Sequence, residues 1–411
     1  MDTCLEVNWR KNLLAVWISQ FLAMAGFCCC MPFIPLLLRD NLHIMNDQTR
    51  GVCVSVYYLA GMVSFTVACA VWGVLSDRLG RKLMLLRASY AAALFYPLLA
   101  FAPDFRVLVL IRFICSFFSG TVNPAQTLLI TNTPPEKHGF VLGTLSTAIW
   151  SGNMTGYMSG GLIVHYFGYT AAFAFCGGLY LISGLLVHIF AEERFTRPEK
   201  PRTKPARTPL RQLLLPGTLR LLILFLVLGI ARRIEEPFVA MQVELVHGSG
   251  DAAFYTGIVS AAAALGGMIS GIMIGRLCDR MSPQKLAAPV VLFSAAATVM
   301  QACSVNIGMF IAARFLAYTA AGGMQPILQV MLTRLVPRSA RGGYLGWSAS
   351  FNTAGGVFCS FLSGAVAYFA GIREIFLAAA LLWMAMLPIL RPVLKSGKTA
   401  EKSPGAFGNP A

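Results

Sequence analysis

Charged side chains are scarce in this chain. Asp, Glu, Lys and Arg make up 12% of the 411 residues, whereas a soluble domain carries about 25%. Hydrophobic residues account for 57%. So few charged side chains cannot cover the surface of a water-soluble protein of this size. The composition therefore excludes a water-soluble protein and predicts one that is dissolved in lipid.

Patterns that bind metals or nucleotides are missing as well. The 11 Cys residues contain no C-x-x-C pair, and the five His residues are scattered. The segment Ser396-Gly397-Lys398-Thr399 resembles the end of a phosphate-binding loop, but Pro392 stands where the first glycine belongs. We therefore expect no metal, no cofactor and no direct use of ATP. Without a nucleophile–base pair, an integral-membrane enzyme is disfavoured too.

Long apolar runs separated by short polar turns dominate the chain. A membrane-spanning helix needs about 20 mostly apolar residues, and lipid admits only helices or closed barrels. Barrel strands would alternate over short segments, whereas these runs are long and rich in Leu, Ala, Gly and Phe. The sequence predicts an all-α integral membrane protein with twelve transmembrane helices at residues 12–38, 52–75, 83–102, 105–128, 139–166, 170–191, 217–245, 253–276, 285–303, 306–332, 343–370 and 372–392.

Basic residues are distributed unevenly among the loops. With both termini in the cytoplasm, the cytoplasmic segments hold 25 of the 33 Lys and Arg residues. Cytoplasmic loops carry an excess of Lys and Arg, so we expect both termini to be cytoplasmic in a protein of the cell inner membrane. The net charge of +16 is then a topology signal, and no nucleic-acid partner is expected. The other basic residues are four in outer loops (Arg39, Arg50, Arg106, Arg373) and four inside spans (Arg112, Arg232, Arg233, Arg314).

An internal repeat relates the two halves of the chain. The segment Gly73–Arg78 recurs 202 residues later as Gly275–Arg280, and Arg112-Phe113 recurs as Arg314-Phe315. This pattern indicates a duplicated six-helix unit, in which the substrate binds between the halves near mid-membrane. We expect an N-terminal bundle at 1–191, a basic Pro-rich cytoplasmic linker at 192–216, a C-terminal bundle at 217–392 and a polar cytoplasmic tail at 393–411.

The loop after the second predicted helix reads Gly73-Val-Leu-Ser-Asp77-Arg78-Leu-Gly80-Arg81-Lys82. It resembles the hallmark G-x-x-x-D-R-x-G-R-[RK] of the major facilitator superfamily, and the weaker copy ending Asp279-Arg280 falls where that family has one. Because Asp77 can accept charge-assisted hydrogen bonds, the loop is expected to form a latch that exists in one of two rocking states. The alternative is that its basic residues only enforce topology.

Two further features resemble the drug-efflux branch of this superfamily. Gly152, Gly156, Gly160 and Gly161 match its antiporter motif G-x-x-x-G-P-x-x-G-G, although Tyr157 replaces the proline. Close helix packing is the alternative reason for these glycines. The family also has an arginine at the position of Arg112, and the resemblance implies a role in proton handling. A structural pairing of this buried arginine is the alternative.

The seventh predicted helix carries Arg232-Arg233-Ile-Glu235-Glu236-Pro237 near mid-membrane. Four charges over one arc cannot face hydrocarbon, and the proline is expected to break the helix. In one interpretation, Arg232–Glu236 and Arg233–Glu236 pairs hold the bend together. In the other, the charges line the cavity, where Glu235 or Glu236 carries a coupling proton or an arginine holds an anionic substrate. Weaker cavity candidates are Asn123, Gln126, Gln325, Gln329 and Asn352.

The chain as a whole looks most like the bacterial twelve-helix multidrug-resistance subgroup, for example in Asn8–Leu13, Met31–Pro35 and Arg81–Arg87. This resemblance implies a monomeric secondary transporter that exports small amphipathic compounds in exchange for protons. A second hypothesis keeps the fold but makes the solute an organic anion or metabolite held by Arg232 or Arg233. A third is a non-transporting membrane sensor, against which no loop is large enough to form a signalling domain.

Overall fold

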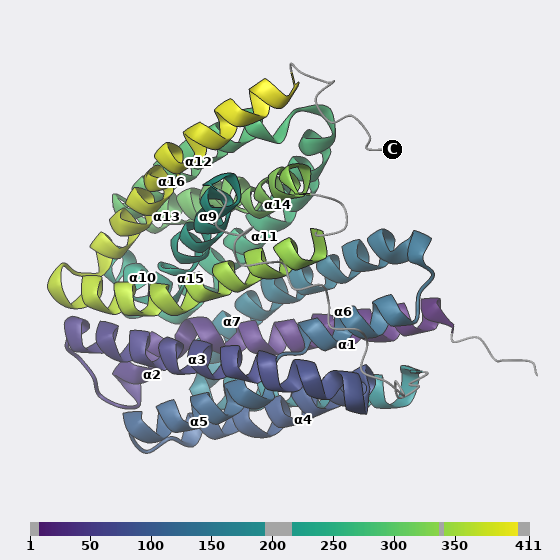
Figure 1. Ribbon diagram of the computed structural model, residues 1–411. Helices are drawn as coiled ribbons and strands as arrows, with labels where there is room; N and C mark the ends of the chain where they lie inside the picture. The colour runs from purple at the N-terminus through teal and green to yellow at the C-terminus, as the bar shows by residue number, and fades with distance from the viewer. Residues whose placement is uncertain (1–7, 194–215, 337–340, 402–411) are drawn as a thin grey trace, which may run out of the picture.

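The computed structural model describes residues 8–193, 216–336 and 341–401 of the chain. Helices are the regular elements of these ranges, and they form two bundles that lie side by side (Figure 1). Residues 194–215 of the predicted linker and 402–411 of the predicted tail lie outside the description.

The N-terminal bundle comprises the helices up to residue 190. They are α1 (Trp9–Cys30), the 3-10 turn η1 (Met31–Phe33), α2 (Ile34–Asp40), α3 (Asp47–Leu79), α4 (Arg81–Leu98), η2 (Leu99–Phe101), α5 (Phe105–Phe118), α6 (Val122–Thr131), η3 (Pro135–Lys137) and α7 (His138–Phe190).

The C-terminal bundle repeats this order. Its elements are α9 (Pro216–Arg233), η4 (Glu236–Phe238), α10 (Val239–His247), α11 (Ala252–Arg280), α12 (Pro283–Ala302), α13 (Ile307–Ala321), α14 (Met324–Leu335), α15 (Arg341–Phe369) and α16 (Ile372–Glu401). The last helix continues nine residues beyond the predicted end at 392, into the segment that we expected to be a polar tail.

The twelve predicted spans are confirmed by these helices. In the described ranges, nine segments are long and apolar enough to cross a membrane. One of them, Pro135–Phe190, contains two spans because Gly168 (φ 80°) interrupts α7. The first part of α7 runs parallel to α1, with 152–160 beside 21–29, and the second part is antiparallel, with Ser183 bonded to Ser19. Residues 216–247 and α15 complete the twelve.

The two bundles share one hydrophobic core at one end only. Near α2 and α10, buried residues of both bundles, such as Phe33 and Phe238, belong to a single cluster. Farther along the helices, each bundle has a core of its own, around Leu129 in the first and Leu328 in the second. We call the end with the shared core the closed end and the opposite end the open end.

Glycines on the facing helices show the same contrast. At the closed end, Gly161 of α7 and Gly257 of α11 meet backbone to backbone, and a Cβ on either would lie 3.0 Å from the other's Cα. At the open end, a Cβ added to Gly73 of α3 or to Gly271 of α11 would meet no atom of another described helix within 4 Å. The halves therefore touch at one end and stand apart at the other.

Candidate functional site

A cavity of about 370 Å³ lies between the bundles and is lined by residues from both. Small-molecule sites typically measure about 300–1,000 Å³, so the space fits a compact solute. Its polar lining combines arginines, one carboxylate, tyrosines and amides: Arg112, Arg232, Arg233, Arg314, Glu236, Tyr58, Tyr157, Tyr318, Asn153, Gln325 and Asn352. Aromatic and apolar groups, among them Phe27, Met62 and Trp150, supply the rest.

The break in the seventh span places the helix-7 charges at this cavity. Helix α9 ends at Arg233, and the backbone resumes in the 3-10 turn η4 with Pro237 at its second position. Proline has no N–H to donate and its ring clashes with the carbonyl one turn earlier, which weakens the regular helix at this point. The predicted break is confirmed, and it turns Arg232, Arg233 and Glu236 into the cavity lining.

Glu235 points away from its neighbours on the chain and binds Arg314 of α13. The side chains are 5% and 2% exposed, and the Glu235 carboxylate accepts a hydrogen bond from Arg314 Nη1. The same nitrogen donates to Gln301 Oε1 at 3.1 Å, and Arg314 Nη2 donates to the Tyr318 hydroxyl at 3.3 Å. This buried pair joins α13 to the break in helix 7.

The other two arginines of helix 7 bind neutral groups. Arg232 Nη1 donates to Gln325 Oε1 at 3.3 Å. Arg233 donates to the Asn352 carbonyl at 2.9 Å and to Asn352 Oδ1 at 3.2 Å. The predicted pairs Arg232–Glu236 and Arg233–Glu236 are not formed in the described structure, because the helix break removes the one-turn spacing that would bring these groups together.

Glu236 is the carboxylate that the break leaves in the cavity. Its side chain is exposed there, and it has no hydrogen bond or ion pair to any described residue. The two adjacent carboxylates therefore differ completely: Glu235 is buried against an arginine, and Glu236 is available to a solute or a proton. From the sequence, either carboxylate was a candidate proton carrier, because helical spacing alone could not show the partner of Glu235 from α13.

Arg112 and Arg314, which the repeat relates, also have different partners. Arg112 is 8% exposed and lies over the Tyr57 ring at 5.2 Å, with no carboxylate bound to it in the described residues. The residue that precedes the turn in each bundle explains why their partners differ. The turns η1 and η4 align, with Met31-Pro32-Phe33 opposite Glu236-Pro237-Phe238. In this register, Cys30 occupies the position of Glu235. The shared Pro-Phe dipeptide was a signal that sequence reasoning missed.

The glycines of the antiporter-like motif contact two different neighbours. Gly152, Gly156 and Gly160 pack against the backbone of α1 at Phe21, Ala25 and Cys29. Gly161 instead faces α11 across the interface between the bundles. Three glycines thus hold one bundle together and the fourth permits contact between bundles. Tyr157, in place of the motif's proline, lines the cavity.

The predicted latch lies at the open end, between α3 and α4. Gly80 adopts φ 95°, a conformation that favours glycine, and ends α3. The backbone N–H groups of Arg81 and Lys82 both donate to the Glu193 carboxylate at 2.8 Å, and Lys82 Nζ donates to the His188 carbonyl. Sequence reasoning missed Glu193, which follows the end of α7 in the chain and reaches the N-terminus of α4 only through the fold.

The remaining predicted residues are dispersed. Arg78 and Arg280 are exposed at the open end, and the side chains of Asp77 and Asp279 lie outside the described structure. Asn123 lines a second cavity of about 200 Å³ together with Gly73. Gln126 and Gln329 line neither cavity. Among the residues that the structure describes, no three His, Cys, Asp or Glu side chains are grouped to hold a metal ion.

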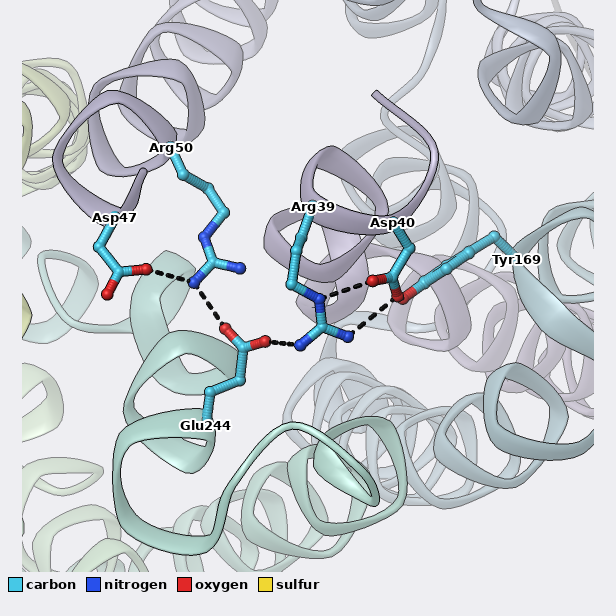
Figure 2. Close-up of polar contacts among 6 residues, drawn as sticks. All are labelled: Arg39, Asp40, Asp47, Arg50, Tyr169 and Glu244. Atoms are coloured by element: carbon cyan, nitrogen blue, oxygen red, sulfur yellow. Dashed lines mark hydrogen bonds and ion pairs between the residues drawn. The ribbon is translucent and has the colours of Figure 1, made fainter. Parts of the chain in front are cut away.

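Ion pairs cross between the bundles at the closed end (Figure 2). Glu244 of α10 lies between Arg39 of α2 and Arg50 of α3, and it pairs with both. No sequence pattern signalled this network, because its members come from three helices that are distant in the chain.

A family profile and similar known proteins match most of this chain. A sequence profile of the Major Facilitator Superfamily matches residues 16–302 and 286–408. The "Multidrug resistance protein MdtG" of Citrobacter koseri is 28% identical over 379 residues, covering 91% of this chain and 92% of that protein. Its counterpart from Salmonella arizonae is 27% identical over the same share of this chain.

Solved structures share the fold at low sequence identity. A bacterial homolog of the human lysosomal transporter Spinster matches with a TM-score of 0.72 at 14% identity, over 98% of this chain and 99% of that chain. The nucleoside transporter NupG matches with a TM-score of 0.73 at 15% identity, over 92% and 99%.

Proposed function

This chain belongs to the major facilitator superfamily, and we propose that it exports small amphipathic compounds in exchange for protons. It is a secondary transporter and not an enzyme. The relatives named as multidrug resistance proteins support drugs as the solute. We place it in the cell inner membrane as a monomer with both termini cytoplasmic, since one chain builds the whole cavity and the open end carries the basic loops.

Alternating access is the mechanism that this architecture supports. The cavity lies between two repeat-related bundles, which meet at the closed end and stand apart at the open end. Rocking one bundle against the other would close the open end and separate the closed end around the same cavity. With cytoplasmic termini, the described state would receive a solute from the cytoplasm.

Glu236 is the residue that we propose to carry the coupling proton. The observation that carries this proposal is the separation of the two carboxylates: Arg314 neutralises Glu235, whereas Glu236 lines the cavity without a partner among the described residues. A solute that donates a hydrogen bond or presents positive charge to Glu236 competes with the proton for the same oxygens. Such competition is what exchange of a solute for a proton requires.

An organic anion is a second candidate solute, and a specific observation favours it. Arg112, Arg232 and Arg233 line the cavity and have no carboxylate partner among the described residues, so one Glu236 leaves positive charge in excess. An anion among these arginines would place a second negative charge beside Glu236, and a coupling proton would offset that charge. Anion and proton would then bind together and move in the same direction.

The direction of proton movement therefore distinguishes the two candidates. The purified protein is reconstituted in vesicles with a trapped pH indicator. Solutes are then added outside, with the same pH on both sides of the membrane. Exchange predicts that an added lipophilic cation drives protons out of the compartment that it enters. Cotransport predicts that an added carboxylate or phosphonate carries protons in with it. Absence of any solute-dependent proton flux, with a solute panel that is nonetheless transported, would refute proton coupling.

A further inference from the structure

The closed end contains a charge network that neither the cavity nor the sequence motifs account for (Figure 2). Glu244, on α10 of the C-terminal bundle, accepts a hydrogen bond from Arg39 Nη1 and lies 2.8 Å from Arg50 Nη2. Both arginines belong to the N-terminal bundle. One carboxylate of one bundle thus bridges two helices of the other.

The network is partly shielded from water. The side chains of Glu244 and Arg50 are 9% and 5% exposed, and that of Arg39 is 20% exposed. Exposed ion pairs contribute little because water and salt screen them, whereas screening is weaker for buried pairs. The only other described ion pair between the bundles, His165–Asp251, is 3.8 Å long, and its Asp251 side chain is 55% exposed.

Each arginine also has a partner within its own bundle. Arg39 Nε donates to Asp40 Oδ1 at 2.6 Å, and the Tyr169 hydroxyl donates to Asp40 Oδ2 at 2.6 Å. Arg50 Nη2 binds Asp47 Oδ1 at 2.6 Å. These contacts do not depend on the other bundle. If the closed end separates, both arginines keep a carboxylate, whereas Glu244 loses its two cationic partners.

We propose that Glu244 is a gating residue that holds this end of the transporter closed by bridging Arg39 and Arg50. The neighbouring cross-bundle contacts lack this charge dependence: Ser55 and Ser363 hydroxyls meet at 3.3 Å, and Gly161 meets Gly257. Small side chains permit the bundles to approach, and the carboxylate bridge supplies a specific attraction that exists in one state only. Because only differential interactions shift a conformational equilibrium, Glu244 biases the cycle toward this state.

Distances between labels test the proposal without any substrate, so the result is independent of the proposed transport activity. Spin labels are placed at the exposed positions Met45 and Ser249, one in each bundle near the network, after the exposed Cys69 and Cys303 are replaced with Ser. Glu244→Gln is expected to shift the ratio of short to long distances at least tenfold toward separation, which corresponds to ~1.4 kcal/mol.

Two matched controls isolate the bridge. Asp47→Asn removes a carboxylate from the same Arg50 but within one bundle, and Asp251→Asn removes the exposed cross-bundle pair. Both are expected to leave the distance distribution close to that of the parent protein. If D47N shifts the ratio as much as E244Q does, general loss of charge is responsible and the gating role is overturned.

A second pair of variants covers the case in which E244Q does not fold. Arg50→Gln removes one side of the bridge from the N-terminal bundle and should shift the distances in the same direction, by a smaller factor because Arg39 remains. The double variant R39Q with R50Q removes both cationic partners of Glu244 and should shift the distances further than R50Q alone, in the same direction as E244Q. Unchanged distances in R50Q, or a double variant R39Q with R50Q that shifts them no further than R50Q does, would contradict the proposal.

Discussion

Arginines at the closed end and arginines in the central cavity have opposite kinds of partner. Arg39 and Arg50 each bind two carboxylates. Among the residues that the structure describes, Arg232 and Arg233 bind only amide groups and a backbone carbonyl. This difference supports the two roles that we propose for arginine in this protein. Where carboxylates bind it, it holds helices or bundles together, and where neutral groups orient it, its charge is left for a solute. Arg314, buried at the cavity edge against Glu235, belongs with the first kind.

The largest expected effect follows from breaking the buried pair. Glu235→Gln leaves Arg314 charged and unpaired in the interior, and removing one partner of such a pair costs about 3–5 kcal/mol. We expect a clear loss of thermal stability in detergent. The double variant E235Q with R314Q should recover most of it, because neither side then carries an uncompensated charge.

The repeat provides the control for this prediction. Arg112 occupies the position equivalent to Arg314 but has no carboxylate partner among the described residues. Arg112→Gln should therefore cost far less stability than Arg314→Gln. Equal losses in the two variants would show that the carboxylate partner does not decide the role of the arginine.

Replacing a cavity arginine is expected to have an intermediate effect, on the apparent affinity for the solute. Arg233→Gln should keep the protein folded, since the partners that it leaves, the Asn352 carbonyl and amide, are neutral. If a solute group binds this guanidinium, losing a charged hydrogen bond of about 1.5–3 kcal/mol lowers apparent affinity roughly tenfold to a hundredfold. Concentration dependence of transport measures this. Unchanged affinity in both R232Q and R233Q would remove the arginines from the binding site.

The smallest effect concerns the latch at the open end, which is the counterpart of the Glu244 bridge. If Asp77 stabilises closure of the open end, Asp77→Asn should shift the population toward the described state, opposite in sign to E244Q. Turnover should fall severalfold while insertion is unaffected. Accessibility of single cysteines from the two sides reports the shift, and unchanged accessibility together with unchanged turnover would leave Asp77 only a role in topology.

Sequence reasoning identified the fold, because long apolar runs, loop charge and the repeat each constrain it independently. It also located the helix break at Pro237, since a missing N–H has local consequences. It could not assign partners. Helical spacing suggested that Arg232 pairs with Glu236, whereas Glu235 pairs with Arg314, which is 79 residues away in the chain. Glu244 and Glu193 escaped notice for the same reason: their partners come from other helices.

Counterflow in the Glu236→Gln variant decides whether Glu236 carries the coupling proton. In reconstituted vesicles, exchange of labelled for unlabelled solute requires only binding and rocking, whereas uphill transport also requires the coupling proton. We expect E236Q to keep counterflow and to lose transport driven by a pH gradient. A variant that retains full gradient-driven accumulation would contradict the assignment of the coupling proton to Glu236.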